Sequence, residues 1–312
     1  MKRSGPLVVL FLVLSVAALA QRPFRGGRGG RGGYSGYGGY DPEDPAGGTW
    51  AEGNVYIGPE VKTPREVETH STGSPTWINP AAFEKDTFTF VRVRRGSNGL
   101  RRSNWATDTP DSDLNLSYRL QQMTSLKVNP DGRFIRLTDP ELADYPFIYM
   151  VEPGTLKLTD DDIAALRKYL NNGGFLMLDD FWGDSEWRNA EQIIKRVLPD
   201  RSFAELPLEH PVYHCVFEIK AKYQVPNVGL GVQSEFDPDH RTWELNHDGD
   251  VRTVHHRAIL DDKGRMMVIA THNTDNGDGW EREGESDYYF HNFSEKVAYP
   301  LGINIIFYAM TH

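Results

Sequence analysis

Acidic side chains follow several short apolar runs of this sequence, at the points where the runs end. Glu152 follows the run Phe147–Val151, and two aspartates follow the run Phe175–Leu178. Carboxylates that gather at one place can bind Ca²⁺ or Mg²⁺ through oxygen. A pair with separated pKa values can instead act as general acid and base. The candidate ligand rim therefore consists of Arg94, Asp108, Glu152, Asp179 and Asp180.

Some acidic residues near this rim have a simpler, structural explanation. Asp111 and Asp184 stand where helices are expected to begin and can cap them. Asp108 precedes Pro110 by two residues and can turn the chain. The aspartates after Phe175–Leu178 differ, because charged groups at the ends of buried strands seldom lack a partner.

A second candidate site is the polar stretch from residue 273 to residue 295. Its NTDNGDG motif resembles a calcium loop but lacks the terminal glutamate spacing of an EF-hand, so we expect at most an irregular cation-binding loop. Aromatic residues follow directly, and aromatics mixed with carboxylates suit stacking against sugar rings. The alternative is a loop that its own aromatics hold against the domain. The candidate residues are Asp275, Asp278, Trp280, Tyr289 and His291.

Several common chemistries lack the motifs they require. The sequence has no CxxC, HExxH or HxH pattern, which argues against zinc. His210 and His214 fall in a predicted strand, where this spacing places them roughly 13 Å apart. No G-x-S-x-G elbow, P-loop or G-x-G-x-x-G motif follows an expected strand, so serine hydrolase, NTPase and dinucleotide-binding functions have no support.

The element that must position the rim is a β-α-β unit over residues 147–183. Phe147–Val151 and Phe175–Leu178 are apolar throughout, as is typical of strands buried on both faces. Between them, Thr159 and Asp162 form a capping-box pattern ahead of apolar residues at helical spacing. Strands joined by a helix run parallel, so both deliver their acidic residues to one edge. In open parallel sheets, ligands bind at that edge.

The remaining pattern extends this unit into one α/β domain. Further strands are expected at residues 88–93, 134–137, 212–219, 252–260 and 266–272, with a hairpin turn at 261–264 and helices beginning near Asp111, Ser185 and Pro300. Residues 233–250 and 273–295 are expected to be polar loops. The predicted fold is a three-layer α/β/α domain with about five parallel strands and an antiparallel hairpin extension.

The residues also carry a family resemblance. WATDTPDSDLNLSYRLQQMTS, PGTLKLTDDDIAALRKYLNNGGFLMLDDFWG, HNTDNGDGWE and AYPLGINIIFYAMTH together resemble the bacterial family called domain of unknown function 4159, over residues 86–312. The resemblance implies a flavodoxin-like sheet similar to class I glutamine amidotransferase domains, in an exported or membrane-tethered context. It implies no established activity. The strand-to-helix elbow that holds Cys in amidotransferases reads Asp179-Asp180-Phe181 here, and Cys215 lies elsewhere, so amidotransferase chemistry is not carried over.

The N-terminal third predicts export and a flexible tail. Residues 1–20 combine Lys2 and Arg3, a short apolar run and an Ala-Leu-Ala end, as in a secretory signal peptide. Residues 21–85 are expected to be a disordered Gly/Arg/Tyr-rich tail and linker with a short docked strand at residues 54–57, and the domain occupies 86–312. No later stretch predicts a transmembrane helix. The net charge of −10 argues against nucleic-acid binding, and a single cysteine excludes an intramolecular disulfide.

Two functions remain open from the sequence. The first is a non-catalytic domain of the bacterial cell envelope, periplasmic or extracellular, that binds an envelope protein or a saccharide at the rim. The second is a hydrolase that uses the carboxylates, with or without Ca²⁺ or Mg²⁺, on carbohydrate or amide bonds. Convergence of three carboxylates on one point among the rim residues Asp108, Glu152, Asp179 and Asp180 favours the second. Pairing of Asp179 and Asp180 with arginines or backbone amides favours the first.

Overall fold

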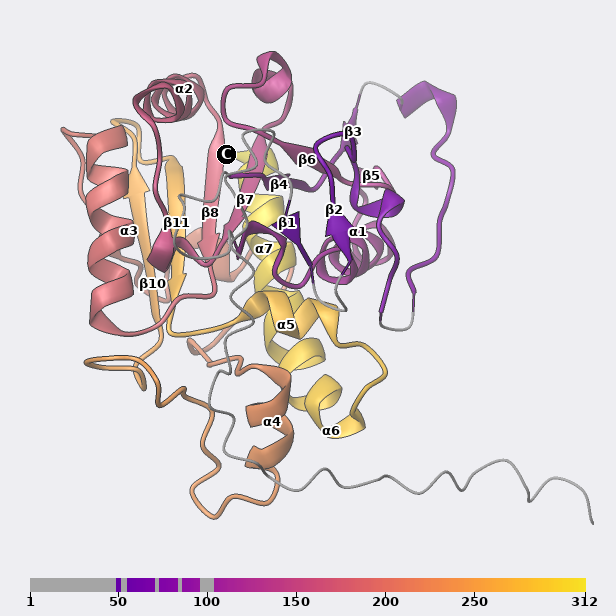
Figure 1. Ribbon diagram of the computed structural model, residues 1–312, viewed down its shortest axis with the longest axis vertical. Coiled ribbons are helices and arrows are strands. Elements are labelled where there is room, and N and C mark those ends of the chain that lie inside the picture. The colour runs from indigo at the N-terminus through magenta and orange to yellow at the C-terminus, as the bar shows by residue number, and fades with distance from the viewer. Residues whose placement is uncertain (1–48, 52–54, 71–72, 84–85, 96–103) are drawn as a thin grey trace, which may run out of the picture. The chain divides into compact units, whose positions relative to one another are not determined.

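The computed structural model describes residues 49–51, 55–70, 73–83, 86–95 and 104–312 (Figure 1). The predicted signal peptide and the Gly/Arg-rich tail lie outside these residues. All described residues fall within one structural unit, Asp41–His312. Among them, no helix combines the length and the apolar character that crossing a membrane requires.

A mostly parallel sheet of seven strands forms the centre of the domain. Five strands run parallel, and beyond them on one side two further strands each pair antiparallel with the neighbour before it, as the predicted hairpin extension requires. The turn predicted at residues 261–264 joins the first of these two to the fifth parallel strand, and the Gly264 amide there donates to the Asp261 carbonyl at 3.1 Å. In spatial order the strands are β6 (Arg133–Ile135), β4 (Val91–Val93), β7 (Phe147–Val151), β8 (Phe175–Asp179), β11 (Met266–His272), β10 (His255–Leu260) and β9 (Ala204–Glu205).

The predicted β-α-β unit is confirmed in each of its parts. Strands β7 and β8 pair in parallel over five residues each. The helix between them, α2 (Asp160–Asn171), begins with the expected capping box, in which the Thr159 hydroxyl accepts from the Asp162 amide and the Asp162 side chain accepts from the Thr159 amide. Its apolar residues turn toward the sheet, while its first turn stays exposed to water.

Alternate residues of the strands feed two separate hydrophobic clusters, one on each face of the sheet. Phe147 and Met177 belong to the cluster that includes α1 (Asp111–Met123) and α7 (Tyr299–Thr311). Ile148 and Leu176 belong to the cluster that includes α2 and α3 (Gly183–Val197). Figure 1 shows α2 and α3 neighbouring one another beside the strands. Burial on both faces explains why the parallel strands are apolar throughout.

Two predicted strands are wrong in detail. The stretch 88–93 divides between β3 (Thr87–Phe88), which pairs with β5 (Lys127–Val128), and β4 of the central sheet. The stretch 212–219 forms no strand; it opens with a 3₁₀ turn, η7 (Pro211–Tyr213). The His210 ring accepts from the Val212 amide there, and proline favours the first turn of a helix, so local capping overrides the β-branched pattern.

The polar stretch 273–295 forms helices instead of the expected loop. It contains α5 (Asn276–Glu281), α6 (Asp287–Tyr289) and most of a π-helix, η8 (Phe290–Ala298). The side chains of Asp275 and Ser286 cap the first two. Predicted caps elsewhere are shifted, because α1 starts behind Pro110 and α3 starts behind Trp182. Asp111 accepts instead from the His70 amide, and Ser185 donates to Asp248.

Residues before the predicted boundary at 86 also pack on the domain. The small hairpin β1 (Thr49–Trp50) and β2 (Tyr56–Ile57) buries Ile57 beside Trp105 and Phe134. The remaining short helices are η2 (Pro64–Glu66), η3 (Ala81–Phe83), η4 (Asn104–Ala106), η5 (Pro140–Asp144), η6 (Pro153–Thr155) and α4 (Val228–Ser234).

Candidate functional site

The order of the parallel strands reverses between β4 and β7. Acidic residues follow both of the strands that flank this point. Asp108 lies in the connection after β4, and Glu152 directly follows β7. Asp180 follows β8, and Asp275 follows β11 by three residues. In open parallel sheets the point of reversal is where a crevice for ligands forms. The topology therefore brings four acidic residues to the edge that the sequence indicates.

Left-handed backbone conformations mark this edge. Glu152, Asp180 and Asn273 follow three adjacent strands with φ of 48°, 55° and 62°, and Asp108 has φ of 64°. For residues other than glycine, each such conformation costs about 1 kcal/mol or more, although Asp and Asn tolerate it best. Strain of this kind concentrates at functional sites, which supports a role for the carboxyl edge.

Asp179 organises the edge and is fully occupied by the protein itself. Its carboxylate accepts from the Thr271 hydroxyl at 2.5 Å, the Asn276 side-chain amide at 2.7 Å, and the Gly277 amide and Tyr149 hydroxyl at 3.1 Å. Burial raises the pKa of Asp179, and the hydrogen bonds from Thr271, Asn276 and Tyr149 offset this shift only in part. The residue therefore joins β8 to the start of α5 and is not exposed to a ligand.

Three buried carboxylates converge beside this junction. Ligand oxygens of Asp108, Asp278 and Glu281 all lie within 4.8 Å of one another, and no other such group of three acidic, His or Cys residues occurs among the described residues. Asp278 and Glu281 are three residues apart on α5, which places them on one helical face. Gly277 allows the close approach of Asp108, because a Cβ at this position would lie 2.1 Å from Asp108 Oδ2.

We call Asp108, Asp278 and Glu281 the acidic trio. Positive side chains and a backbone amide already contact part of it. Arg282 Nε lies 2.5 Å from Glu281 Oε2 and 3.9 Å from Asp278 Oδ1, and His70 Nε2 lies 3.3 Å from Glu281 Oε1. The Val228 amide donates to Asp278 Oδ2 at 2.6 Å. Buried carboxylates need compensation of this kind, because isolated charges are costly away from water.

The ligand chemistry of the acidic trio suits a hard divalent cation. Its three carboxylates offer oxygen ligands within 4.8 Å of one another. Ca²⁺ and Mg²⁺ both prefer such oxygens, and Ca²⁺ accepts irregular geometry where Mg²⁺ demands a near-ideal octahedron. Side chains from a loop and a short helix therefore suit Ca²⁺ better.

Asp180 and Asp275 form a second acidic group at the same edge. Desolvation raises the pKa of Asp180 well above its usual value, helped by the charges of Glu152 and Asp108. Desolvation and Asp180 itself do the same for Asp275. The Trp182 indole donates to Asp180 at 3.1 Å, and the Asp278 amide donates to Asp275 at 2.8 Å. Raised pKa values in one place permit proton transfer near neutral pH.

The predicted arginine of the rim has a structural role. Arg94 donates to the carbonyls of Gly58 and Val61, both at 2.7 Å, and its guanidinium lies over the Trp105 ring. It therefore holds the segment before the first strand of the sheet. Its neighbour Arg95 donates to the Val151 and Glu152 carbonyls, where it steadies the end of β7.

The predicted aromatic site does not form a surface for stacking sugars. Trp280 and Tyr289 are buried, and their polar atoms donate to the Ala298 and Pro226 carbonyls at 2.9 and 2.7 Å. His291 is exposed on η8 and bonds to Glu295. The aromatic residues therefore hold this segment against the domain, which is the alternative given in the sequence analysis. Asp275 and Asp278 of the same segment lie at the carboxyl edge.

Sequence reasoning missed Glu281, His70 and Arg282 as members of the site. Glu281 stands three residues after Asp278, which is a pairing signal only once the segment is known to be helical. His70 comes from the stretch predicted to be linker. The pair His210 and His214 makes other contacts. The His210 ring accepts from the Val212 amide, and the His214 ring bonds to Glu218 and the Leu208 carbonyl.

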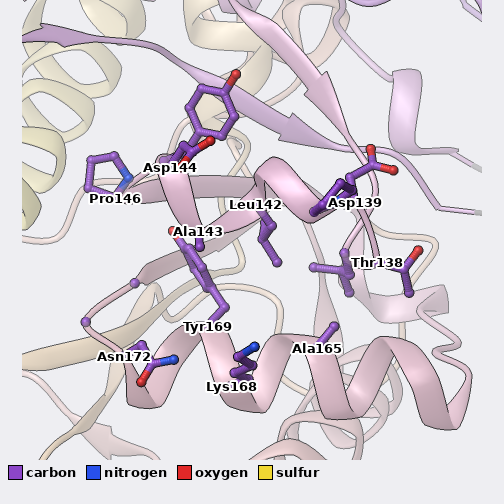
Figure 2. Close-up of a pocket in the computed structure, with 15 residues that line it drawn as sticks. Thr138, Asp139, Leu142, Ala143, Asp144, Pro146, Ala165, Lys168, Tyr169 and Asn172 are labelled. Carbon is purple, nitrogen blue, oxygen red and sulfur yellow. The ribbon is translucent and has the colours of Figure 1, made fainter. Parts of the chain in front are cut away.

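The opposite edge of the sheet holds a cavity of about 470 Å³. Figure 2 shows Leu142 and Ala143 of η5 facing Ala165 and Tyr169 of α2 across it. The cavity borders Pro146 and Gly174, which precede β7 and β8, so it lies at their amino ends. It contains none of the predicted site residues.

Comparison with known proteins agrees with the resemblance read from the sequence. A search of curated proteins found no match. The family model described as "Domain of unknown function (DUF4159)" matches residues 89–310, which is well over half of the chain. The protein with this acidic carboxyl edge therefore belongs to the DUF4159 family.

Proposed function

We propose that this protein is a calcium-binding, non-catalytic ligand-binding domain. Its acidic trio would hold Ca²⁺, and the carboxyl edge beside it would bind the ligand. The observation that carries the proposal is the convergence of Asp108, Asp278 and Glu281 within 4.8 Å in a buried position. An ion there would join the connection after β4, on one side of the point where the strand order reverses, to α5, which follows β11.

The fold supports this location. Numbered along the chain, the five parallel strands lie in the order 2-1-3-4-5, which is the order of flavodoxin-like sheets, and we assign the domain to that fold. Glu152 and Asp180 are partly exposed at this edge. Carboxylates accept hydrogen bonds from hydroxyl groups, so a hydroxyl-rich saccharide is the class of ligand we propose.

Calorimetric titration of the EDTA-treated domain tests the calcium site. We expect one saturable event with Ca²⁺ and weaker binding of Mg²⁺. Asp278→Asn should weaken Ca²⁺ binding strongly, because it removes one negative ligand. The exposed residue Asp161 of α2 provides the matched control, and Asp161→Asn should bind like the wild type. Equal Ca²⁺ affinity of both variants would contradict the assignment.

A hydrolase is the second candidate, favoured by the raised pKa values of Asp180 and Asp275. One protonated and one ionised carboxyl group could act as acid and base on a glycosidic or amide bond. Chromogenic glycosides and anilides provide the assay. Turnover that is lost in both Asp180→Asn and Asp275→Asn, with the fold intact, would establish this function over the non-catalytic one. Complete absence of turnover in the wild type would leave the binding function alone.

We also propose export of the protein to the cell envelope, with the Gly/Arg-rich tail as a tether. This rests on the pattern of residues 1–20 and on the glycine and arginine content that follows. Mass spectrometry of the protein from its native host should find a mature chain beginning at Gln21. A cytoplasmic chain that retains residues 1–20 would contradict export.

A further inference from the structure

A second cavity, of about 330 Å³, lies apart from the carboxyl edge. Its walls come from the segment 217–223, from His256 of β10, and from the junction of η8 with α7. Phe217, Ile219, Val297 and Leu301 supply an apolar lining. The volume is at the lower end of the range for small-molecule sites, so the cavity suits a small ligand.

The segment that forms one wall is held in place by hydrogen bonds and is therefore preformed. Asn304 of α7 is fully buried. Its side chain accepts from the amides of Val216 and Phe217 at 3.1 and 2.8 Å and donates to the Phe217 carbonyl at 2.8 Å. The Ile219 amide donates to the Tyr213 carbonyl at 2.9 Å. A ligand would enter this space without having to order the wall.

A buried imidazole borders the cavity, and one of its ring nitrogens has no hydrogen-bond partner in the part of the chain that the structure describes. His256 is 1 % exposed, and its Nδ1 lies 3.0 Å from the Tyr213 hydroxyl. Its Nε2 is buried and has no hydrogen-bond partner among the described residues. Burial lowers the pKa of His256 to about 3, so the ring is neutral. When the Tyr213 hydroxyl donates to Nδ1, the proton of the neutral ring resides on Nε2, which is then a donor in need of an acceptor.

Charged groups at the cavity favour an anion. Lys220 and Lys296 line it and are exposed, so their charges remain available at its mouth. The acidic member of the lining, Glu218, lies 3.0 Å from His214. Tyr223, also in the lining, is 57 % exposed, which adds an apolar surface at the entrance.

We propose that this cavity binds a small amphipathic carboxylate, with its apolar part between Phe217 and Leu301 and its carboxylate accepting from His256 Nε2 near the two lysines. The site is separate from the acidic trio, whose charge would repel such a ligand. The proposal does not depend on the function proposed above.

Calorimetric titration of the domain with hexanoate tests the proposal, with hexan-1-ol and hexylamine as the uncharged and cationic counterparts. We expect saturable one-to-one binding of hexanoate and at least about tenfold weaker binding of the other two, since a hydrogen bond to a charged group is stronger than one between neutral groups. Hexanoate should also shift the Nε2 nitrogen resonance of His256. No saturable binding, or equal binding of all three compounds, would overturn the proposal.

Variants separate the named contacts from general apolar binding. His256→Phe should weaken hexanoate binding about 10- to 100-fold. Lys296→Met should weaken it about two- to fivefold, while the control Lys263→Met, in the exposed β10–β11 turn, should have no effect. If His256→Phe does not fold, the hexanoate affinity of the surface double variant Lys220→Met/Lys296→Met is measured instead. Unchanged affinity of that variant would overturn the proposal, and a loss that is smaller at high salt would support it.

Discussion

Replacing Gly277 by alanine separates the calcium site from the fold of the domain. The new Cβ would lie 2.1 Å from Asp108 Oδ2, whereas ordinary contact begins near 3.4 Å. The carboxylate must therefore retreat by about 1.3 Å, a large shift beside metal–oxygen distances of about 2.3–2.6 Å. The variant removes no carboxylate, and the φ of Gly277 is not positive, so alanine fits the backbone.

Thermal unfolding with and without Ca²⁺ measures this effect. For the wild type, Ca²⁺ at a hundred times its dissociation constant should add about 2.7 kcal/mol of stability, or roughly 5–10 °C in Tm for a domain of this size. We expect a shift below about 2 °C for Gly277→Ala. Gly229→Ala is the matched control, because its Cβ would meet nothing closer than Asn227 Oδ1 at 3.5 Å, and it should keep the full shift.

The reasoning fails if Gly277→Ala folds and retains a calcium-dependent shift as large as that of the wild type. Without Ca²⁺, replacing a helical glycine by alanine should raise the free energy of unfolding by about 0.5–1 kcal/mol. The clash with Asp108 opposes this gain. Loss of stability without Ca²⁺, together with an unchanged calcium-dependent shift, would place the ion elsewhere.

Three further predictions concern charges inside the domain. Arg92 and Asp113 form a fully buried ion pair at 2.7 Å. Arg92→Met should therefore lower the free energy of unfolding, measured by chemical denaturation, by about 3–5 kcal/mol, because it leaves a buried charge unpaired. The double variant Arg92→Met/Asp113→Leu should regain most of this stability, and an equal loss in both variants would contradict the prediction. Hydrogen bonds that His247 donates to the Glu186 and Glu244 carboxylates raise its pKa to about 9. The stabilisation is therefore complete below the unfolded pKa of about 6.5 and is lost as pH rises through about 9. After solvent screening, His247→Gln should cost about 1–2 kcal/mol at pH 6 and nothing above pH 10, and a constant cost would contradict the pairing. The raised pKa of Asp275 acts in the same direction at lower pH: its protonated form favours the fold, so stability without Ca²⁺ falls as pH rises above about 4. Asp275→Asn keeps a side-chain oxygen for the cap, and its stability relative to the wild type should increase from pH 4 to pH 7; a difference that does not vary with pH would contradict this.

The central part of the fold was predictable because its signals are local. The capping box at Thr159 and Asp162 and the apolar runs on both sides lie within 37 consecutive residues. The hairpin turn at 261–264 is equally local. Each of these elements needs little information from distant parts of the chain, so pattern and propensity agree with the final structure.

The segment after β11 could not be predicted in the same way. Helix α5 has six residues, fewer than an isolated helix needs in water, and polar residues dominate it. Asp179 holds its start through Asn276 and Gly277, which lie almost a hundred positions away in the sequence. Its burial therefore depends on tertiary contacts that no local pattern indicates.

The sequence could place some acidic residues at the carboxyl edge, but it could not indicate which of them meet. Parallel strand topology places Asp108, Glu152 and Asp180 at one edge, as expected. Asp179, in contrast, is occupied by hydrogen bonds, and Arg94 binds backbone carbonyls of the preceding segment. The acidic trio combines residues from two connections, and their meeting depends on how α5 packs.

Terbium luminescence gives the most direct test of the calcium site. Tb³⁺ replaces Ca²⁺ at oxygen-rich sites, and Trp280 lies between Asp278 and Glu281 on α5, where it can transfer excitation energy to the ion. We predict saturable emission on excitation of tryptophan, competed away by Ca²⁺ and lost in Asp278→Asn but not in Asp161→Asn. Emission that is absent in the wild type, or unchanged in Asp278→Asn, would contradict a calcium site at the acidic trio.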